Sequence, residues 1–215
     1  MYLPKHFEET RPDRLHALLR LHPLGLLVTQ DAQGGAVADA LPLMLDADRG
    51  PHGTLVGHVA RANPLWQSAS VGREVLVVFQ GPAGYISPNG YASKAEHGRV
   101  VPTWNYAMVQ ARGPLQVVDD PATVLGLVTR LTQRHEARQA RPWSVGDAPE
   151  TYIAAMLKAI VYIEIPLAVA LLGKYKLNQH RSEADQQSMQ DLLQAGDAPA
   201  QDLALWMRAP PAAAE

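Results

Sequence analysis

An arginine stands between a strand-like segment and a helix start, an arrangement that can bind an anion. Thr54–Val59 is rich in β-branched residues, and Asn63-Pro64 suits an N-cap and first helical position, which predicts a short helix over Asn63–Ser70. Free N–H groups and the dipole at a helix start attract anions, and Arg61 can grip a phosphate in bidentate fashion. The same residues would equally make an N-capped surface helix with Arg61 in a salt bridge.

A second candidate is the aromatic segment around Asn105. Trp104 and Tyr106 flank this amide at the beginning of a long β-rich stretch. Aromatic rings supply a flat apolar wall, while the amide and the hydroxyl supply hydrogen bonds, so a planar heterocycle with a polar edge would suit the segment. Taken alone, the two rings fit a core or interface position better.

A third candidate is the polar, basic segment Gly173–Arg181. It directly follows the most apolar stretch of the chain, Ala159–Gly173, and it carries Lys174, Lys176 and Arg181. Its charge predicts either a loop that closes over a negatively charged ligand or an ordinary solvated connection.

The sequence lacks the common catalytic and phosphate-binding signatures. It contains no G-x-G-x-x-G or G-x-x-x-x-G-K loop, no G-x-S-x-G elbow and no H-E-x-x-H pair, and its 215 residues include no cysteine. We therefore expect no metal site, no disulfide and no cysteine nucleophile, and the sequence assigns no catalytic residue.

Arginines recur at four-residue spacing on one predicted helix. A stripe within Ala122–Arg138 contains Arg130, Arg134 and Arg138. The whole chain has 19 Lys and Arg against 21 Asp and Glu, a net charge of −2, so its overall charge does not favour binding to nucleic acid. We interpret the stripe as a solvated face and keep a phosphate-contacting face as the alternative.

The predicted elements do not alternate regularly between strand and helix. We expect strands at Leu24–Thr29, Val37–Leu45, Thr54–Val59, Glu74–Gln80, Ala83–Ser87, Asn105–Val118 and Ala159–Leu172, with Gly81-Pro82 as a break. We expect helices at Arg11–Leu21, Asn63–Ser70, Ala122–Arg138, Pro149–Leu157, Arg181–Ala195 and Asp202–Met207. This order favours an α+β, mainly β design, in which helices pack outside an antiparallel sheet or barrel.

The chain is expected to form a single domain over residues 1–208, with helical additions towards its C-terminus and a disordered tail over 209–215. Met1–Phe7 is polar where a signal peptide would be apolar, and Ala159–Gly173 is interrupted by Glu164 and Pro166. We therefore expect a soluble, cytoplasmic protein without a membrane partner.

Five short motifs resemble those of PaiB-like proteins, which are described as FMN-binding negative transcriptional regulators. They are Met1–Phe7 (M-Y-x-P-x-x-F), Gly57–Pro64 (G-H-x-A-x-x-N-P), Gly81–Pro88 (G-P-x-x-Y-I-S-P), Pro102–Tyr106 (P-T-W-N-Y) and Lys176–Arg181 (K-L-S-Q-N-R). The chain departs from the family pattern at Gly90, where a tryptophan is usual, and at Asn178 and His180 in the last motif. Matches in the right order over residues 1–181 make the resemblance specific.

The resemblance implies an antiparallel split β-barrel of the pyridoxamine-phosphate-oxidase-like type that holds FMN at a homodimer interface. Arg61 and the backbone at Asn63 would then take the flavin phosphate, and the run His58, Val59 and Ala60 would lie beside the ribityl chain or the ring edge. The isoalloxazine would lie near a second group, formed by Trp104, Asn105 and Tyr106. A third group, formed by Lys176, Gln179 and Arg181, would complete the phosphate or ring contacts.

Three functions are consistent with a flavin in this chain. The family description favours a regulator whose FMN is a ligand or a redox sensor, with DNA, a protein or a metabolite as its further partner. The alternative is an FMN-dependent oxidoreductase reduced by a nicotinamide cofactor, because the flavin supplies the redox chemistry and no side-chain acid or base is strictly required. The third is a flavin-storage dimer without turnover, and heme binding through His6, His58 or His97 ranks last.

Overall fold

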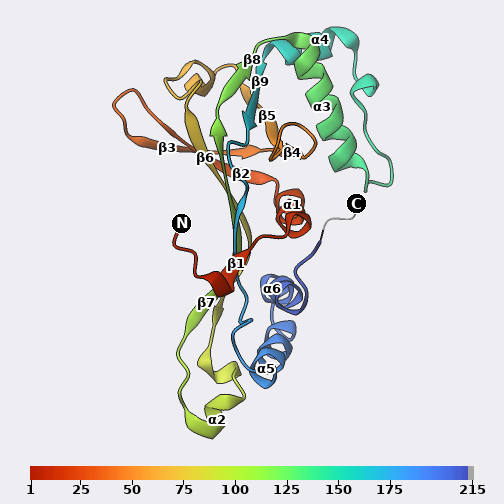
Figure 1. Ribbon diagram of the computed structural model, residues 1–215. Helices are drawn as coiled ribbons and strands as arrows, with labels where there is room; N and C mark the ends of the chain where they lie inside the picture. The colour runs from red at the N-terminus through yellow and green to blue at the C-terminus, as the bar shows by residue number, and fades with distance from the viewer. Residues whose placement is uncertain (213–215) are drawn as a thin grey trace. The chain divides into compact units, whose positions relative to one another are not determined.

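The computed structural model describes residues 1–212 as two compact units (Figure 1). The first unit comprises Met1–His22, Phe79–Gln110 and the chain from Leu171 onwards, and the second comprises Pro23–Val78 and Ala111–Ala170. Residues 209–212 belong to no helix or strand, and the rest of the predicted tail lies outside the described residues. The expectation of a single domain stays a prediction.

Antiparallel strands and helices make up both units. The strands are β1 (Glu8–Glu9), β2 (Leu24–Gln30), β3 (Ala36–Pro42), β4 (Met44–Asp46), β5 (Thr54–Ala60), β6 (Glu74–Ile86), β7 (Thr103–Pro114), β8 (Gln116–Val118), β9 (Ile160–Pro166) and β10 (Leu172–Lys176). The α-helices are α1 (Pro12–Leu21), α2 (Ser93–His97), α3 (Pro121–Glu136), α4 (Glu150–Lys158), α5 (Glu183–Gln194) and α6 (Ala198–Arg208). Four 3-10 turns are η1 (Lys5–Phe7), η2 (Pro64–Gln67), η3 (Pro88–Gly90) and η4 (Val145–Asp147).

A four-stranded sheet in the order β4-β5-β9-β8 forms the centre of the second unit, and α3 covers one of its faces. Apolar side chains of α3 pack on this sheet and form a core with it, made of Val124, Leu127, Leu131, Met44, Val56 and Tyr162. Asp120 begins the helix because its carboxylate accepts a hydrogen bond from the Thr123 N–H at 2.8 Å. Residues between β8 and α3 are therefore held close to the end of β5.

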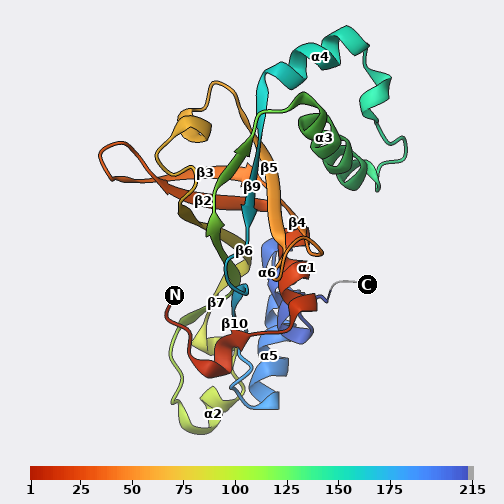
Figure 2. The same ribbon diagram turned by 45° about the horizontal axis from the view of Figure 1, so that its top comes forward.

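The β2–β3 hairpin of the second unit leaves one of its faces open. Leu26 pairs with Ala40 on one side and with Val78 of β6 on the other, so these three side chains share a face. The residues of this open apolar face are exposed or partly exposed, and they are Leu24, Leu26, Val28, Ala38, Ala40, Leu76 and Val78. Figure 2 shows the tip of the hairpin standing away from β5 and β9.

In the first unit β10 lies between β1 and β7, and β6 follows β7. The helices α1, α5 and α6 pack on one face of these strands, where the rings of Tyr175 and Trp206 lie 5.7 Å apart. The hydroxyl of Tyr175 also donates a hydrogen bond of 2.9 Å to the carbonyl of Arg14 in α1. The opposite face carries the aromatic and basic side chains described below.

The structure corrects the predicted strand boundaries. Gly81-Pro82 does not break the strand, because β6 runs unbroken from Glu74 to Ile86. β2 pairs with β6 only from Leu76 to Val78, so the later half of β6 borders an edge, where proline is tolerated. Three predicted long strands are divided instead, at Leu43, Leu115 and 167–171, where the chain passes from one sheet to the other.

The predicted helix over Asn63–Ser70 is also wrong in length, because only the 3-10 turn Pro64–Gln67 forms. Within residues 1–212, no helix is both long and apolar enough to cross a membrane.

Candidate functional site

Arg61 follows the end of β5, and its guanidinium is held by three kinds of contact. It makes a bidentate ion pair with Asp119, at 2.9 Å from Nη1 and 2.5 Å from Nη2. Its Nε donates to the carbonyl of Lys158 at 2.7 Å, and the guanidinium carbon lies 5.3 Å from the centre of the Trp66 ring. The side chain is nevertheless 37% exposed, so an anion from solution can reach it.

The sequence left phosphate binding and a salt bridge open for Arg61, and the structure contains the salt bridge. Hydrogen bonds from Arg61 lower the pKa of Asp119, so this carboxylate is ionised at neutral pH. Asp119 was missed by the sequence analysis because it lies 58 residues after Arg61. The pairing of β9 with β5 on one side and with β8 on the other brings the two residues together.

Asn63 caps the short turn η2, as predicted. Its side-chain oxygen accepts from the Leu65 N–H at 2.9 Å, and its side-chain nitrogen donates to Asp39 at 3.2 Å. Because η2 has only four residues, its dipole is small, and Arg61 supplies the positive charge of this region.

The residues before Arg61 alternate between two faces of β5. Val59 is 2% exposed and belongs to the core, whereas His58 and Ala60 point to the opposite side. Burial lowers the pKa of His58, so the imidazole is neutral near pH 7, and its buried Nδ1 has no hydrogen-bond partner among the described residues. Buried polar atoms are normally satisfied, so this nitrogen is suited to a ligand.

A hollow of about 430 Å³ adjoins His58 in the same unit. The residues that line it are mainly apolar or aromatic, and they are Pro42, His58, Leu131, Thr132, His135, Glu136 and Trp143. Glu136 holds the segment in place by accepting a hydrogen bond from the backbone of Trp143 at 2.9 Å. No sequence signal marks Trp143, because the residue lies outside every motif and predicted element.

The segment Trp104–Tyr106 does not form one group, because consecutive residues of β7 face opposite sides. Asn105 is fully buried on the helix-covered side, where its side-chain nitrogen lies 3.5 Å from the sulfur of Met207 and its oxygen has no partner among the described residues. Trp104 is 58% exposed on the other side and meets Tyr85 edge-on, with ring centres 6.3 Å apart. Alternation along a strand therefore separates the amide from the two rings.

Tyr106 shares the open side with two lysines of β10. Lys176 is its direct partner across the strands and donates to the hydroxyl of Thr103, while Nζ of Lys174 lies 5.5 Å from the centre of the Tyr106 ring. We call this surface the aromatic–basic face, and its residues are Tyr85, Trp104, Tyr106, Lys174 and Lys176. It combines flat apolar walls with positive charge.

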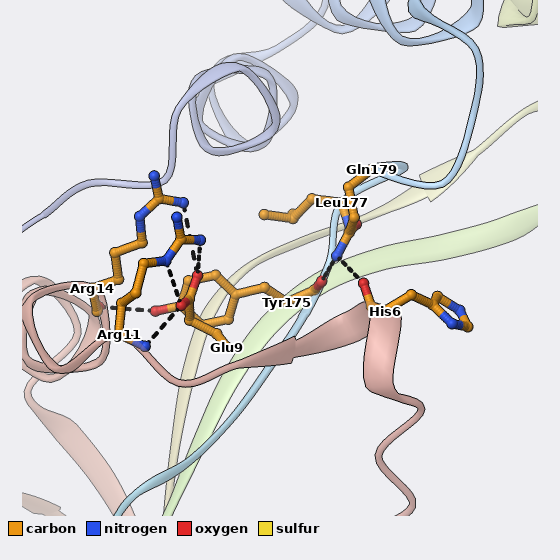
Figure 3. Close-up of polar contacts among 7 residues, drawn as sticks. All are labelled: His6, Glu9, Arg11, Arg14, Tyr175, Leu177 and Gln179. Carbon is orange, nitrogen blue, oxygen red and sulfur yellow. Dashed lines mark hydrogen bonds and ion pairs between the residues drawn. The ribbon is translucent and has the colours of Figure 1, made fainter.

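Gln179 is fully engaged in holding the loop after β10 (Figure 3). Its side-chain nitrogen donates to the carbonyl of His6 at 3.0 Å and to that of Tyr175, and its oxygen accepts from the Leu177 N–H at 2.7 Å. It therefore ties the loop to the N-terminal segment, and both of its side-chain N–H donors are already used.

Arg181, at the end of the same loop, lies over the ring of Tyr91 at 4.8 Å. Its buried Nε has no partner among the described residues, and neither has the side-chain nitrogen of Asn178. Asn178 adopts a positive φ of 66°, a conformation that asparagine tolerates better than most residues. Two buried nitrogen donors thus lie in one short loop without an acceptor among residues 1–212.

A buried carboxylate, Glu9, fastens the N-terminal segment beside this loop (Figure 3). Glu9 is 5% exposed and accepts hydrogen bonds from the Arg11 backbone at 3.0 Å and from its Nε at 2.8 Å, with Arg14 at 3.7 Å. This cluster could not be predicted from the sequence, because an E-x-R-x-x-R pattern is not specific for any structure.

The predicted site residues therefore fall into two groups within different units. His58, Val59, Ala60, Arg61 and Asn63 belong to the second unit, and Trp104, Asn105, Tyr106, Lys176, Gln179 and Arg181 belong to the first. In the second unit an exposed guanidinium follows an unpartnered imidazole beside an apolar hollow. These features fit a ligand that combines an anionic group with a flat apolar ring and a polar edge, as FMN does.

Comparisons with known proteins agree with this chemistry. Residues 1–169 match the model of a family described as "Putative FMN-binding domain". The chain is 30% identical over 199 residues to the protease synthase and sporulation protein PAI 2 of Bacillus subtilis, which covers 93% of this chain and 92% of that protein. It is 31% identical over 219 residues to an uncharacterized protein of Emericella nidulans, covering 86% and 87% of the two chains.

Solved structures show the fold. The FAD and heme binding protein from Mycobacterium smegmatis matches with a TM-score of 0.55 and 18% identity, over 79% of this chain and 73% of that one. The flavocytochrome Anf3 from Azotobacter vinelandii matches with a TM-score of 0.54 and 13% identity, over 81% and 72%. The predicted fold class, antiparallel sheets of the split-barrel type with outer helices, is confirmed.

The resemblance noted from the five motifs is likewise confirmed, since the family model covers well over half of the chain and the Bacillus subtilis relative nearly all of it. The chain belongs to the FMN-binding family whose model it matches, and FMN is its cofactor.

Proposed function

We propose that this protein is a PaiB-type negative transcriptional regulator in which FMN serves as a ligand or a redox sensor. Membership of an FMN-binding family and similarity to a sporulation protein over nearly the whole chain support this role. The observation that carries the flavin site is the exposed Arg61 fork after β5, which follows by three residues the unpartnered His58 and its apolar hollow. When bound, FMN supplies redox chemistry, and the residues of the chain bind and orient it.

Each predicted contact residue has a role in this proposal. Arg61 holds the flavin phosphate next to Asn63, and His58 and Ala60 line the ribityl chain or ring edge in front of the buried Val59. Trp104 and Tyr106 stack near the ring from the partner subunit, with Lys176 and Arg181 as positive charges. Asn105 supports the strand from its buried side, and Gln179 holds the loop after β10 in place through its hydrogen bond to the carbonyl of His6.

Binding of FMN to a variant without the guanidinium tests the phosphate assignment. We expect Arg61→Ala to weaken FMN binding about tenfold, the loss of roughly one charge-assisted hydrogen-bonding interaction at a partly exposed site. Binding of riboflavin, which has no phosphate, should change little. Quenching of flavin fluorescence on titration measures both constants, and equal losses for the two flavins would contradict a phosphate contact.

We also propose that the chain forms a homodimer through the open apolar face. Leu24 and Leu26 are 62% and 42% exposed there, and a contiguous exposed apolar surface usually marks an interaction site. A groove of about 540 Å³ is lined partly by Val28 and Leu76 of this face, and side chains of a second copy can fit into it.

A charge on this face should separate the subunits. We expect Leu26→Lys to convert a dimer into a monomer in sedimentation or light-scattering measurements, because the buried ammonium would have no partner. Val37→Lys is the matched control, since Val37 is 40% exposed but pairs with Thr29 and points to the other side of the hairpin. A dimer that survives Leu26→Lys places the interface elsewhere.

The alternative function is an FMN-dependent oxidoreductase of the flavin or nicotinamide reductase type. Membership of an FMN-binding family is compatible with it, because a bound flavin supplies the redox chemistry and no side-chain acid or base is strictly required. Steady oxidation of NADH or NADPH by the FMN-loaded protein would establish this activity. A change in affinity for DNA when the flavin is reduced would instead support the regulator.

A further inference from the structure

The guanidinium of Arg61 is already occupied by an anion of the chain itself. Asp119 meets it with two oxygens at 2.5 and 2.9 Å, in the parallel geometry with which an arginine also binds a phosphate. Both side chains are partly exposed, Arg61 by 37% and Asp119 by 49%. An anion from solution that binds the Arg61 guanidinium must therefore replace the carboxylate of Asp119.

We propose that Asp119 competes with the flavin phosphate for Arg61 and thereby keeps FMN exchangeable. The inference rests on the proposed function, in which Arg61 is the phosphate contact. The carboxylate carries one negative charge, whereas a phosphate monoester carries about −1.5 to −2 near pH 7, so FMN can displace it. Riboflavin brings no anion and leaves the pair intact.

The guanidinium does not depend on Asp119 for its position. Its Nε donates to the carbonyl of Lys158 at 2.7 Å, its Nη2 lies 3.4 Å from the carbonyl of Ile160, and Trp66 packs against its flat face. The ring nitrogen of Trp66 in turn donates to the carbonyl of Arg61 at 2.8 Å. The fork stays oriented when the carboxylate leaves.

Asp119 can leave by a side-chain movement alone. It lies between the end of β8 and the start of α3, and the neighbouring Asp120 anchors the backbone by capping the helix. Because the Asp119 side chain is half exposed, rotation places its carboxylate in solvent at little cost. A departed carboxylate still repels the phosphate, which lowers the affinity for FMN further.

Removing the charge of Asp119 tests the competition. We expect Asp119→Asn to bind FMN about fivefold more tightly, as the loss of an exposed ion pair predicts, and to bind riboflavin as the unmodified protein does. Asp119→Glu keeps the charge and should keep the original affinity for FMN. The matched control is Asp48→Asn, which removes an exposed charge of the same unit from the loop after β4 and should leave binding unchanged.

The same titrations separate the two levels of the proposal. Weaker or unchanged FMN binding by Asp119→Asn, while Arg61→Ala still loses affinity for FMN alone, means that Asp119 positions the guanidinium or is irrelevant, and overturns the competition. If Arg61→Ala loses no more affinity for FMN than for riboflavin, the phosphate assignment is overturned instead. Inorganic phosphate provides a second readout, since it should raise the melting temperature of Asp119→Asn more than that of the unmodified protein.

Discussion

Gly113→Ala is expected to lower the free energy of unfolding by about 3 kcal/mol, the upper range for overpacking a buried position. A Cβ at Gly113 would lie 1.9 Å from the carbonyl oxygen of Pro166 and 3.1 Å from a methyl carbon of Ile165. The backbone cannot move aside easily, because the Ala168 N–H donates to the carbonyl of the adjacent Arg112 at 2.9 Å. For a chain of this size the loss corresponds to about 9 °C in melting temperature, which calorimetry measures.

The control for this prediction is the same substitution in an open position. Gly126 is exposed in α3, and no atom outside the helix backbone lies within 4 Å of a Cβ added there. Gly126→Ala should therefore stabilise the protein by roughly 0.5–1 kcal/mol, because alanine favours the helix. A Gly113→Ala protein that melts like the original would mean that β7 and Pro166 are not packed as described.

The second large effect is expected at the buried Glu9. Burial would raise the pKa of Glu9, but the hydrogen bonds and charge of Arg11, helped by Arg14, outweigh it, and the pKa lies below 4.5. The carboxylate contributes stability above pH about 4.5, the value in the unfolded chain, and loses it as the pH falls through its lowered folded-state pKa. We expect Glu9→Gln to cost about 2 kcal/mol at pH 7, since it removes charge-assisted hydrogen bonds.

Urea unfolding at several pH values tests the sign of this effect. The difference between Glu9→Gln and the original protein should be complete at pH 6 to 7 and should shrink steadily below pH 4.5. Glu8→Gln is the control on the adjacent, exposed residue of β1 and should cost little at any pH. A difference that stays constant down to pH 3 would show that packing rather than charge holds Glu9.

The loop that carries the last motif shows why the role of a residue and its motif can differ. The K-L-S-Q-N-R resemblance placed Gln179 among the ligand contacts. In the fold its amide spans His6, Tyr175 and Leu177, so its hydrogen bonds shape the loop. A motif identifies which residues matter, but the direction of a side chain depends on the strands and turns around it.

The alternation of side chains along a strand also applies to residues 104–106. The family resemblance groups Trp104, Asn105 and Tyr106, although consecutive residues of a strand face opposite sides. The buried Asn105 and the 58% exposed Trp104 follow that rule. By contrast, no sequence pattern tells which of the two faces of β7 is covered by helices. α6 packs against β7 only when the whole first unit has folded.

The local elements and the family can be predicted from the amino-acid sequence. The apolar spacing within α3, the capping of η2 by Asn63 and the antiparallel class depend on neighbours within a few residues, and the five motifs are read directly. Which residues these elements bring together depends on the folded chain. Arg61 meets Asp119 across 58 residues and Gln179 meets His6 across 173, because strand pairing joins distant segments that no local periodicity connects.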